Sequence, residues 1–173
     1  MLCETCKCKC IQLTSYSSTF EKWRAFIDSL DSINSRDALI ARVLLATKAR
    51  FNSIARVKIE DIDFEKSTLQ LPPRKKKNAL PTLHSLPDIL VHMIKNYLSN
   101  TDLTNRSPTL FITRNNKPVS RNRLNFSFTK AYKYIKGATQ KIVPDSLRHI
   151  YPELIRDGYH DDIIFGSKNE QRT

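Results

Sequence analysis

The spacing of apolar residues changes twice along this chain, from helical to alternating and back to helical. Between Ser18 and Leu45, large apolar residues recur every three or four positions, as one buried face of a helix requires. From Thr68 to Leu83 they alternate with polar residues, which favours short strands. Helical spacing returns after Ser85. This order of helices, hairpin and helices predicts an α+β domain that is mostly α-helical, with a small β-hairpin or sheet.

Local signals predict where these elements begin and end. Ser18 and Glu21 form a capping-box pattern at the start of the first helix. The later expectations are a second helix capped by Ser35, a short helix over 52–57, strands at 68–71 and 80–83 around the basic connection 72–78, a helix capped by Ser85 with Pro87 in its first turn, a strand at 110–112, a helix capped by Ser120, and a last helix from about Asp145 to Asp157 that Gly158 ends.

The charge of the chain is strongly positive. Its 29 Lys and Arg residues against 17 Asp and Glu give a net charge of +12. Such a field attracts polyanions, and nucleic acid is the commonest partner of a basic domain, although a solvated basic surface without a ligand is the alternative. No apolar stretch approaches the roughly 20 residues that cross a bilayer, and the N-terminus lacks a secretory pattern. We therefore expect no membrane partner and a cytoplasmic location.

All four cysteines, Cys3, Cys6, Cys8 and Cys10, lie in one short segment. Structural zinc sites pair two well-separated couples of ligands, and no second couple is present here. A soft-metal thiolate cluster is the alternative. We expect residues 1–17 to be a Cys-rich, disordered lead-in, with no metal and no cofactor.

Three segments in this order resemble the catalytic domain of tyrosine recombinases, the phage-integrase family. They are residues 36–50 with the following 52–64, the basic hairpin, and residues 142–149. The resemblance covers residues 18–158 and implies that Arg50 and Arg148 are the two catalytic arginines. Lys75 in the hairpin turn matches the catalytic lysine, with Arg74 and Lys76 as alternatives.

The chemistry of that family explains these residue types. A tyrosine hydroxyl attacks a DNA phosphodiester and forms a 3′-phosphotyrosyl link without a metal, so protein cations must neutralise the non-bridging oxygens. Two guanidiniums match the phosphate geometry, and a lysine protonates the departing 5′ oxygen as general acid. The resemblance therefore implies double-stranded DNA and other recombinase subunits as partners. The expected further DNA-binding residues are Arg74, Lys76, Lys77, Arg121 and Arg123.

The sequence also departs from the family pattern. Asp145 takes the position of the family His or Lys, and we expect it to be a helix N-cap. Ser53 replaces an acidic residue, and Pro152 falls inside the last helix, which must either restart there or have lost the native fold. Tyr151 is expected in the core.

The nucleophile is the decisive departure. The resemblance places a His box and then the tyrosine after the last helix, whereas Gly166 is followed by Ser167 and no tyrosine. We expect residues 159–173 to be a divergent or truncated tail, Tyr159 to be no substitute, and the chain to bind DNA without cleaving it. One alternative is a recombinase whose tyrosine comes from a partner subunit or another chain segment, and another is a basic nucleic-acid-binding module unrelated to recombinases.

Overall fold

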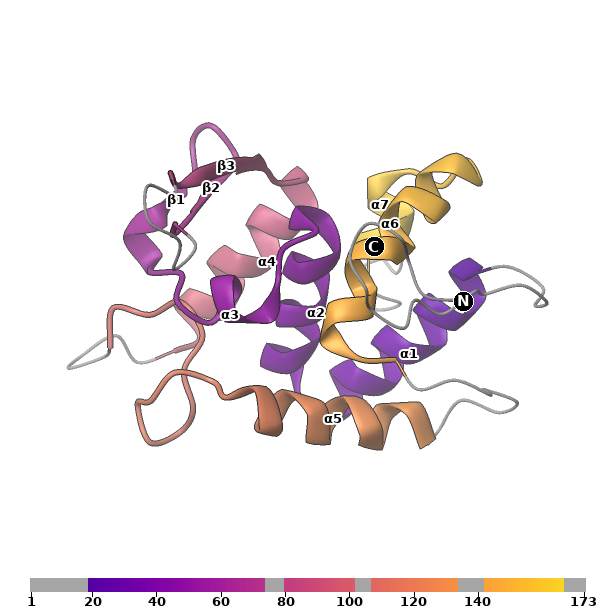
Figure 1. Cartoon of the computed structure of the whole chain (residues 1–173), viewed down its shortest axis with the longest axis horizontal. Helices are drawn as coiled ribbons and strands as arrows, with labels where there is room; N and C mark the ends of the chain where they lie inside the picture. The colour runs from indigo at the N-terminus through magenta and orange to yellow at the C-terminus, as the bar shows by residue number, and fades with distance from the viewer. Residues whose placement is uncertain (1–18, 74–79, 102–106, 134–141, 167–173) are drawn as a thin grey trace.

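The computed structural model describes residues 19–73, 80–101, 107–133 and 142–166 (Figure 1). Its helices are α1 (Thr19–Ile33), α2 (Ser35–Thr47), α3 (Phe51–Ile54), α4 (Asp88–Ser99), α5 (Arg121–Lys133), α6 (Leu147–Arg156) and α7 (Asp161–Phe165). Strands β1 (Ile62–Asp63), β2 (Thr68–Leu71) and β3 (Thr82–Ser85) form one antiparallel sheet, and 3-10 turns lie at Ile59–Asp61 and Pro144–Ser146. The mostly helical α+β class is confirmed.

Helix α2 is the central element. It packs against α1, α4 and α6, and α5 packs across α1. Figure 1 shows the sheet on one side of α2, α6 and α7 on the other, and α5 along the lower edge. The apolar face that the spacing predicts in α1 is buried, and the ring of Phe26 meets that of Phe128 on α5 edge-on, with centroids 5.0 Å apart. This core fixes the ends of α2, α5 and α6 relative to one another.

The hairpin is confirmed, with its second strand two residues later than expected. Strand β2 spans residues 68–71 as predicted, and its Leu69 and Leu71 are buried. Leu71 pairs with Thr82, so Leu80 lies outside the ladder and its side chain is 81% exposed. Pro81, which has no N–H to donate, separates Leu80 from the strand. The hairpin's connection, residues 74–79, lies outside the described residues.

Several expected helix starts and one strand need correction. Asn34, not Ser35, caps α2, because its side chain accepts a hydrogen bond from the Asp37 N–H at 3.2 Å. Ser85 ends β3 and caps no helix, and Pro87 directly precedes α4. Residues 110–112 make only an isolated bridge, Ile112 to Pro118. The expected cap Ser120 is confirmed, since its hydroxyl accepts from the Arg123 N–H at 3.3 Å. Ser18 lies outside the described residues.

The helix that contains Pro152 neither restarts at that residue nor loses its fold there, which were the two alternatives expected from the sequence. Helix α6 begins at Leu147, after a 3-10 turn that contains Asp145, and it continues through Pro152 to Arg156. Asp145 is therefore not its N-cap. Gly158 follows with the left-handed φ of 87° that stops the helix, as expected. Among the described residues no helix is long and apolar enough to cross a membrane.

Helix α7 packs into the core beyond Gly158. Ile164 and Phe165 are fully buried. The indole N–H of Trp23 donates to the Ile164 carbonyl at 2.8 Å, and Arg42 Nε donates to the Phe165 carbonyl at 3.0 Å. The boundary expected at Gly158 stays a prediction, because residues 167–173 lie outside the described part.

Candidate phosphate-binding site

Arg50 lies where the chain leaves α2 and enters α3. The Thr47 hydroxyl donates to the Val43 carbonyl at 2.7 Å within the last turn of α2. Lys48 then takes a left-handed conformation, with φ 54° and ψ 20°. This reversal ends the helix, and Arg50 follows in an extended conformation with its side chain exposed. Its guanidinium is thus presented to solvent at the end of a buried helix.

Arg148 lies in the first turn of α6 and is half-buried. Its Nε donates to Nε2 of His149 at 3.1 Å. Acceptance at Nε2 requires a neutral imidazole with its proton on Nδ1. Burial lowers the pKa of His149, and the positive charge of Arg148 lowers it further. Both effects keep the ring in the form that orients Arg148.

Three side-chain contacts bring these arginine-bearing segments together. The Arg121 guanidinium, at the start of α5, lies 5.8 Å from the ring centroid of Phe51, the residue after Arg50. Its Nη1 also pairs with Asp145 Oδ2 at 2.7 Å, three residues before Arg148. On the other side, Lys48 Nζ lies 5.3 Å from the centroid of the Tyr151 ring. The predicted catalytic arginines therefore belong to adjacent segments, with α2 packed along α6.

The hairpin approaches the same region through β3. His84 on β3 is half-buried, and its pKa is lowered by burial and then by the charge of Lys48. Lys48 is thus close enough to the hairpin stem for its charge to act there. The hairpin residues predicted for the site, Arg74, Lys75, Lys76 and Lys77, lie outside the described residues.

Three cations near the end of α2 and the start of α6 are not held in ion pairs with described residues. Among the residues that the structure describes, ion pairs occupy arginines elsewhere, including Arg36 with Asp37 and Arg42 with Asp31. No ion pair with a described residue involves Lys48, Arg50 or Arg148. Concentrated positive charge without a counter-charge favours an anion such as phosphate. The sequence analysis missed Lys48, which its position two residues before Arg50 could have suggested.

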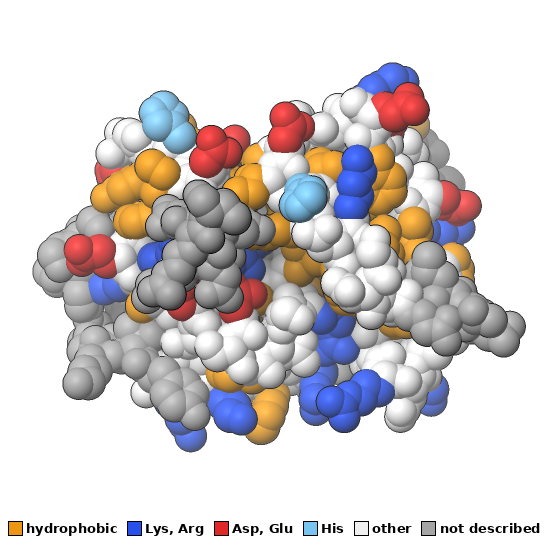
Figure 2. Space-filling view, turned by 180° about the vertical axis from the view of Figure 1, so that it is seen from behind, with side chains coloured by type: hydrophobic (Ala, Val, Ile, Leu, Met, Phe, Trp, Pro, Cys, Tyr) orange, Lys and Arg blue, Asp and Glu red, His pale blue; other side chains and the backbone are white. Residues whose placement is uncertain are grey.

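The basic surface continues along α5. Arg123, Lys130 and Lys133 are exposed on this helix, together with Phe126, which is 65% exposed. Figure 2, the face opposite to that of Figure 1, shows Lys and Arg side chains along its lower edge, where α5 runs. Of the two α5 arginines predicted to bind DNA, Arg121 is engaged by Asp145, whereas Arg123 is turned to solvent.

Neither tyrosine near the end of the described chain is arranged as a nucleophile. The Tyr151 hydroxyl donates to Asp161 Oδ1 at 2.8 Å. Burial, assisted by this carboxylate, raises the pKa of Tyr151 to about 12. The Tyr159 ring is stacked on Phe20, with centroids 4.3 Å apart. Tyr151 is only partly buried, but it packs against the core as expected.

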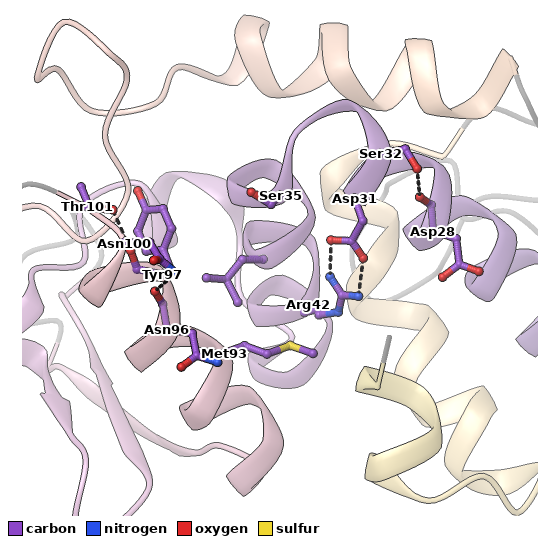
Figure 3. Close-up of a pocket in the computed structure, with 11 residues that line it drawn as sticks. Asp28, Asp31, Ser32, Ser35, Arg42, Met93, Asn96, Tyr97, Asn100 and Thr101 are labelled. Carbon is purple, nitrogen blue, oxygen red and sulfur yellow. Dashed lines mark hydrogen bonds and ion pairs between the residues drawn. The ribbon is translucent and has the colours of Figure 1, made fainter. Parts of the chain in front are cut away.

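Two other features of the chain lie apart from this site. No group of three or more metal-ligating side chains occurs in the described ranges, and the cysteine segment lies outside them. A polar cavity of about 700 Å³ lies between α1, α2 and α4, and its lining includes Asp28, Asp31 and Arg42 (Figure 3). None of the predicted site residues lines this cavity.

Comparison with protein families identifies the class of this chain. Residues 17–165 match the model of the phage integrase family. The chain therefore belongs to this family, and the resemblance inferred from its motifs is confirmed. The alternative of a basic module unrelated to recombinases is wrong.

Individual relatives agree with this assignment. The chain is 31% identical over 137 residues to tyrosine recombinase XerA of Pyrococcus furiosus, a match covering 78% of this chain and 46% of that protein. Its fold matches a crystal structure of XerA recombinase with a TM-score of 0.66 at 21% identity, covering 87% of this chain and 54% of the other. The XerH recombinase bound to difH in a pre-cleavage complex matches with a TM-score of 0.63 at 19% identity, covering 88% of this chain and 47% of the other. A lambda integrase (75–356) dimer bound to a COC′ core site matches with a TM-score of 0.63 at 15% identity, covering 87% of this chain and 57% of the other. The chain spans about half the length of these relatives.

Proposed function

We propose that this chain binds duplex DNA as the catalytic-domain part of a tyrosine recombinase, with Arg50 and Arg148 holding one phosphate between them. The observation that supports this most directly is that the two arginines lie on adjacent segments and form no ion pair with another described residue. A guanidinium stays charged and offers a planar fork of donors, so two of them can contact both non-bridging oxygens of a phosphodiester.

The relatives support DNA and further subunits as partners. The XerH structure contains its difH substrate, and the lambda integrase structure is a dimer on a core site. A net charge of +12 and the exposed basic side chains of α5 suit the same ligand. We assign Arg123 and the hairpin residues Arg74, Lys76 and Lys77 to flanking phosphates. A cytoplasmic location belongs to the same proposal.

The recombination chemistry would use the same cations. A tyrosine oxygen forms a bond to phosphorus while the bond to the 5′ oxygen breaks, and that oxygen takes a proton. Arg50 and Arg148 would stabilise the charge on the non-bridging oxygens. Lys75 would supply the proton, with Arg74 and Lys76 as the alternatives for its position.

We propose that these 173 residues alone do not form the covalent link. The Tyr151 hydroxyl donates a hydrogen bond to Asp161, and its pKa is raised to about 12, so it is a poor nucleophile at neutral pH. Cleavage would require a tyrosine from a partner subunit or from another stretch of chain. A duplex with a nick beside the scissile phosphate traps any phosphotyrosyl adduct. We expect none, and any adduct would contradict this proposal; Tyr151→Phe would then show whether Tyr151 is the nucleophile.

DNA binding is tested by measuring affinity against salt concentration with a fluorescently labelled duplex of mixed sequence. Arg50→Ala and Arg148→Ala should each weaken binding roughly tenfold, as expected for a lost charge-assisted hydrogen bond. Each should also reduce the slope of log affinity against log salt by about 0.9, because one phosphate contact is lost. Arg156→Ala is the matched control, since Arg156 is exposed at the opposite end of α6. Unchanged slopes for both site variants would refute the proposal.

A further inference from the structure

We propose that Lys48 is a third phosphate-binding cation of this site, an inference that rests on the proposed function. Its ammonium would contact the phosphate held by Arg50 and Arg148, or the phosphate next to it on the same strand. Neither the family motifs nor the spacing of apolar residues had singled out this lysine.

The backbone at Lys48 is the first observation. Its φ of 54° and ψ of 20° lie in the left-handed region at the C-terminal cap of α2. Helices commonly end there with glycine, or sometimes asparagine, because a Cβ is unfavourable in this conformation. A lysine at this position is therefore not selected by local backbone preference. Glycine would fit this backbone with less strain, so whatever this position adds beyond ending the helix comes from the lysine side chain.

The position of the ammonium is the second observation. Lys48 is exposed, and its Nζ lies 5.3 Å from the centroid of the Tyr151 ring. Tyr151 is three residues after Arg148, and residues three apart share one face of a helix. The charge of Lys48 also acts on His84 of β3. The ammonium is thus placed among the end of α2, the Arg148 face of α6 and the hairpin stem.

The third observation is that no described carboxylate forms an ion pair with this ammonium. Lys48 forms no ion pair with any residue in the described part of the chain. The Tyr151 ring orients the ammonium without neutralising it, because a ring face attracts a cation only through its quadrupole. Like charges on adjacent segments repel one another, and a phosphate bound among them would reduce that repulsion.

A purely structural role makes different predictions. Lys48 could favour α2 by placing a positive charge at the negative end of the helix dipole, or by covering the Tyr151 ring. In either case its loss would lower thermal stability and leave the salt dependence of DNA binding unchanged. Under our proposal the salt dependence changes, and stability is maintained when the new residue suits the left-handed conformation.

The test compares Lys48→Asn and Lys48→Gly in the full 173-residue chain, with the labelled duplex described above. Both replacements remove the charge and tolerate the left-handed backbone. We expect roughly tenfold weaker binding and a salt slope lower by about 0.9, with no loss in the melting temperature. Lys48→Arg should restore most of the slope.

Lys95→Asn is the matched control. Lys95 is also exposed and lies over an aromatic ring, that of Phe64, at 5.6 Å, but it belongs to α4. Its replacement should leave the slope unchanged. If the Lys48 variants keep the wild-type slope while Arg50→Ala loses it, the role of Lys48 is refuted and DNA binding by the arginines is not. If Arg50→Ala and Arg148→Ala keep the slope as well, the proposed function itself fails.

Discussion

The buried guanidinium of Arg42 offers the sharpest test of how the C-terminal helix is held. Arg42 is 2% exposed in the middle of α2. It donates to Asp31 at 3.1 and 2.6 Å (Figure 3). It also donates to the carbonyl of Phe165 at the end of α7 at 3.0 Å. Replacing Arg42 with Met keeps much of the apolar stem and removes all three bonds. We expect α7 to be the element that this replacement affects most.

The size of the effect follows from what is left unpaired. Removing one partner of a fully buried ion pair costs about 3–5 kcal/mol. The Asp31 side chain is 31% exposed and can regain water, which reduces this cost, whereas the Phe165 carbonyl loses a donor worth about 1 kcal/mol. Arg42→Met should therefore lower the free energy of unfolding by about 2–4 kcal/mol. For a domain of this size that corresponds to roughly 5–15 °C in melting temperature.

Urea unfolding followed by circular dichroism measures this change, and Asp31→Asn with the double variant completes a thermodynamic cycle. The two side chains touch, so their coupling energy should be about 1–3 kcal/mol. A loss below about 0.5 kcal/mol for Arg42→Met, within the range of ordinary surface substitutions, would refute the argument. If Arg42→Met lowers the free energy of unfolding as expected but the cycle shows no coupling between Arg42 and Asp31, the stability comes from the contact with Phe165 instead.

Two further predictions concern α6. The pKa of His149 is lowered in the folded state from its usual 6.5, so the unfolded chain binds the proton more readily and stability falls as pH drops below about 6.5. His149→Gln should therefore reduce the loss of melting temperature between about pH 7.5 and 5.5. An equal loss in the variant and the wild type would exclude His149 as a cause. Pro152 is exposed inside α6 and cannot donate to the Arg148 carbonyl one turn earlier. Removing an interior proline gains roughly 3 kcal/mol, which a more flexible unfolded chain partly offsets, so Pro152→Ala should raise the free energy of unfolding by about 1–2 kcal/mol. An unchanged urea midpoint would show that α6 has already adapted to the proline.

Features of the fold that depend on local patterns were predictable from the sequence. Strand β2 matched its expected range because Leu69 and Leu71 alternate with polar residues and are both buried. The cap of α2 was misplaced by one residue because Asn34 and Ser35 are both good capping residues, and only the tertiary entry angle of the chain decides between them. The start of β3 depended on the pairing register with β2, which apolar spacing alone does not determine.

Features that depend on contacts between distant segments were not predictable. Arg42 looked like an interruption of an apolar helix, because nothing local indicates Asp31 or the end of α7 as its partners. Asp145 was expected to be a helix cap, because its actual partner Arg121 lies 24 positions away and no local pattern indicates that ion pair. The proposed site motifs could be recognised because each lies within a short stretch of sequence. That the segments of Arg50 and Arg148 are adjacent, with Lys48 beside Tyr151, depends instead on how α2 packs on α6.

The pairing of Asp145 also decides whether its replacement of the family His or Lys destroys phosphate binding. An unpaired carboxylate about 8 Å from a phosphate would repel it by roughly 2 kcal/mol at an effective dielectric constant of about 20. Here Asp145 Oδ2 lies 2.7 Å from Arg121 Nη1, so the pair as a whole has no net charge and its repulsion falls off steeply with distance. Relative to a His or Lys at this position, Asp145 removes a hydrogen-bond donor and cancels the positive charge of Arg121, but it forms no ion pair with Arg50, Arg148 or Lys48. If Arg50, Arg148 and Lys48 bind a phosphate as proposed, we expect that binding to survive the substitution and the loss to fall on any chemical step that needs the missing donor.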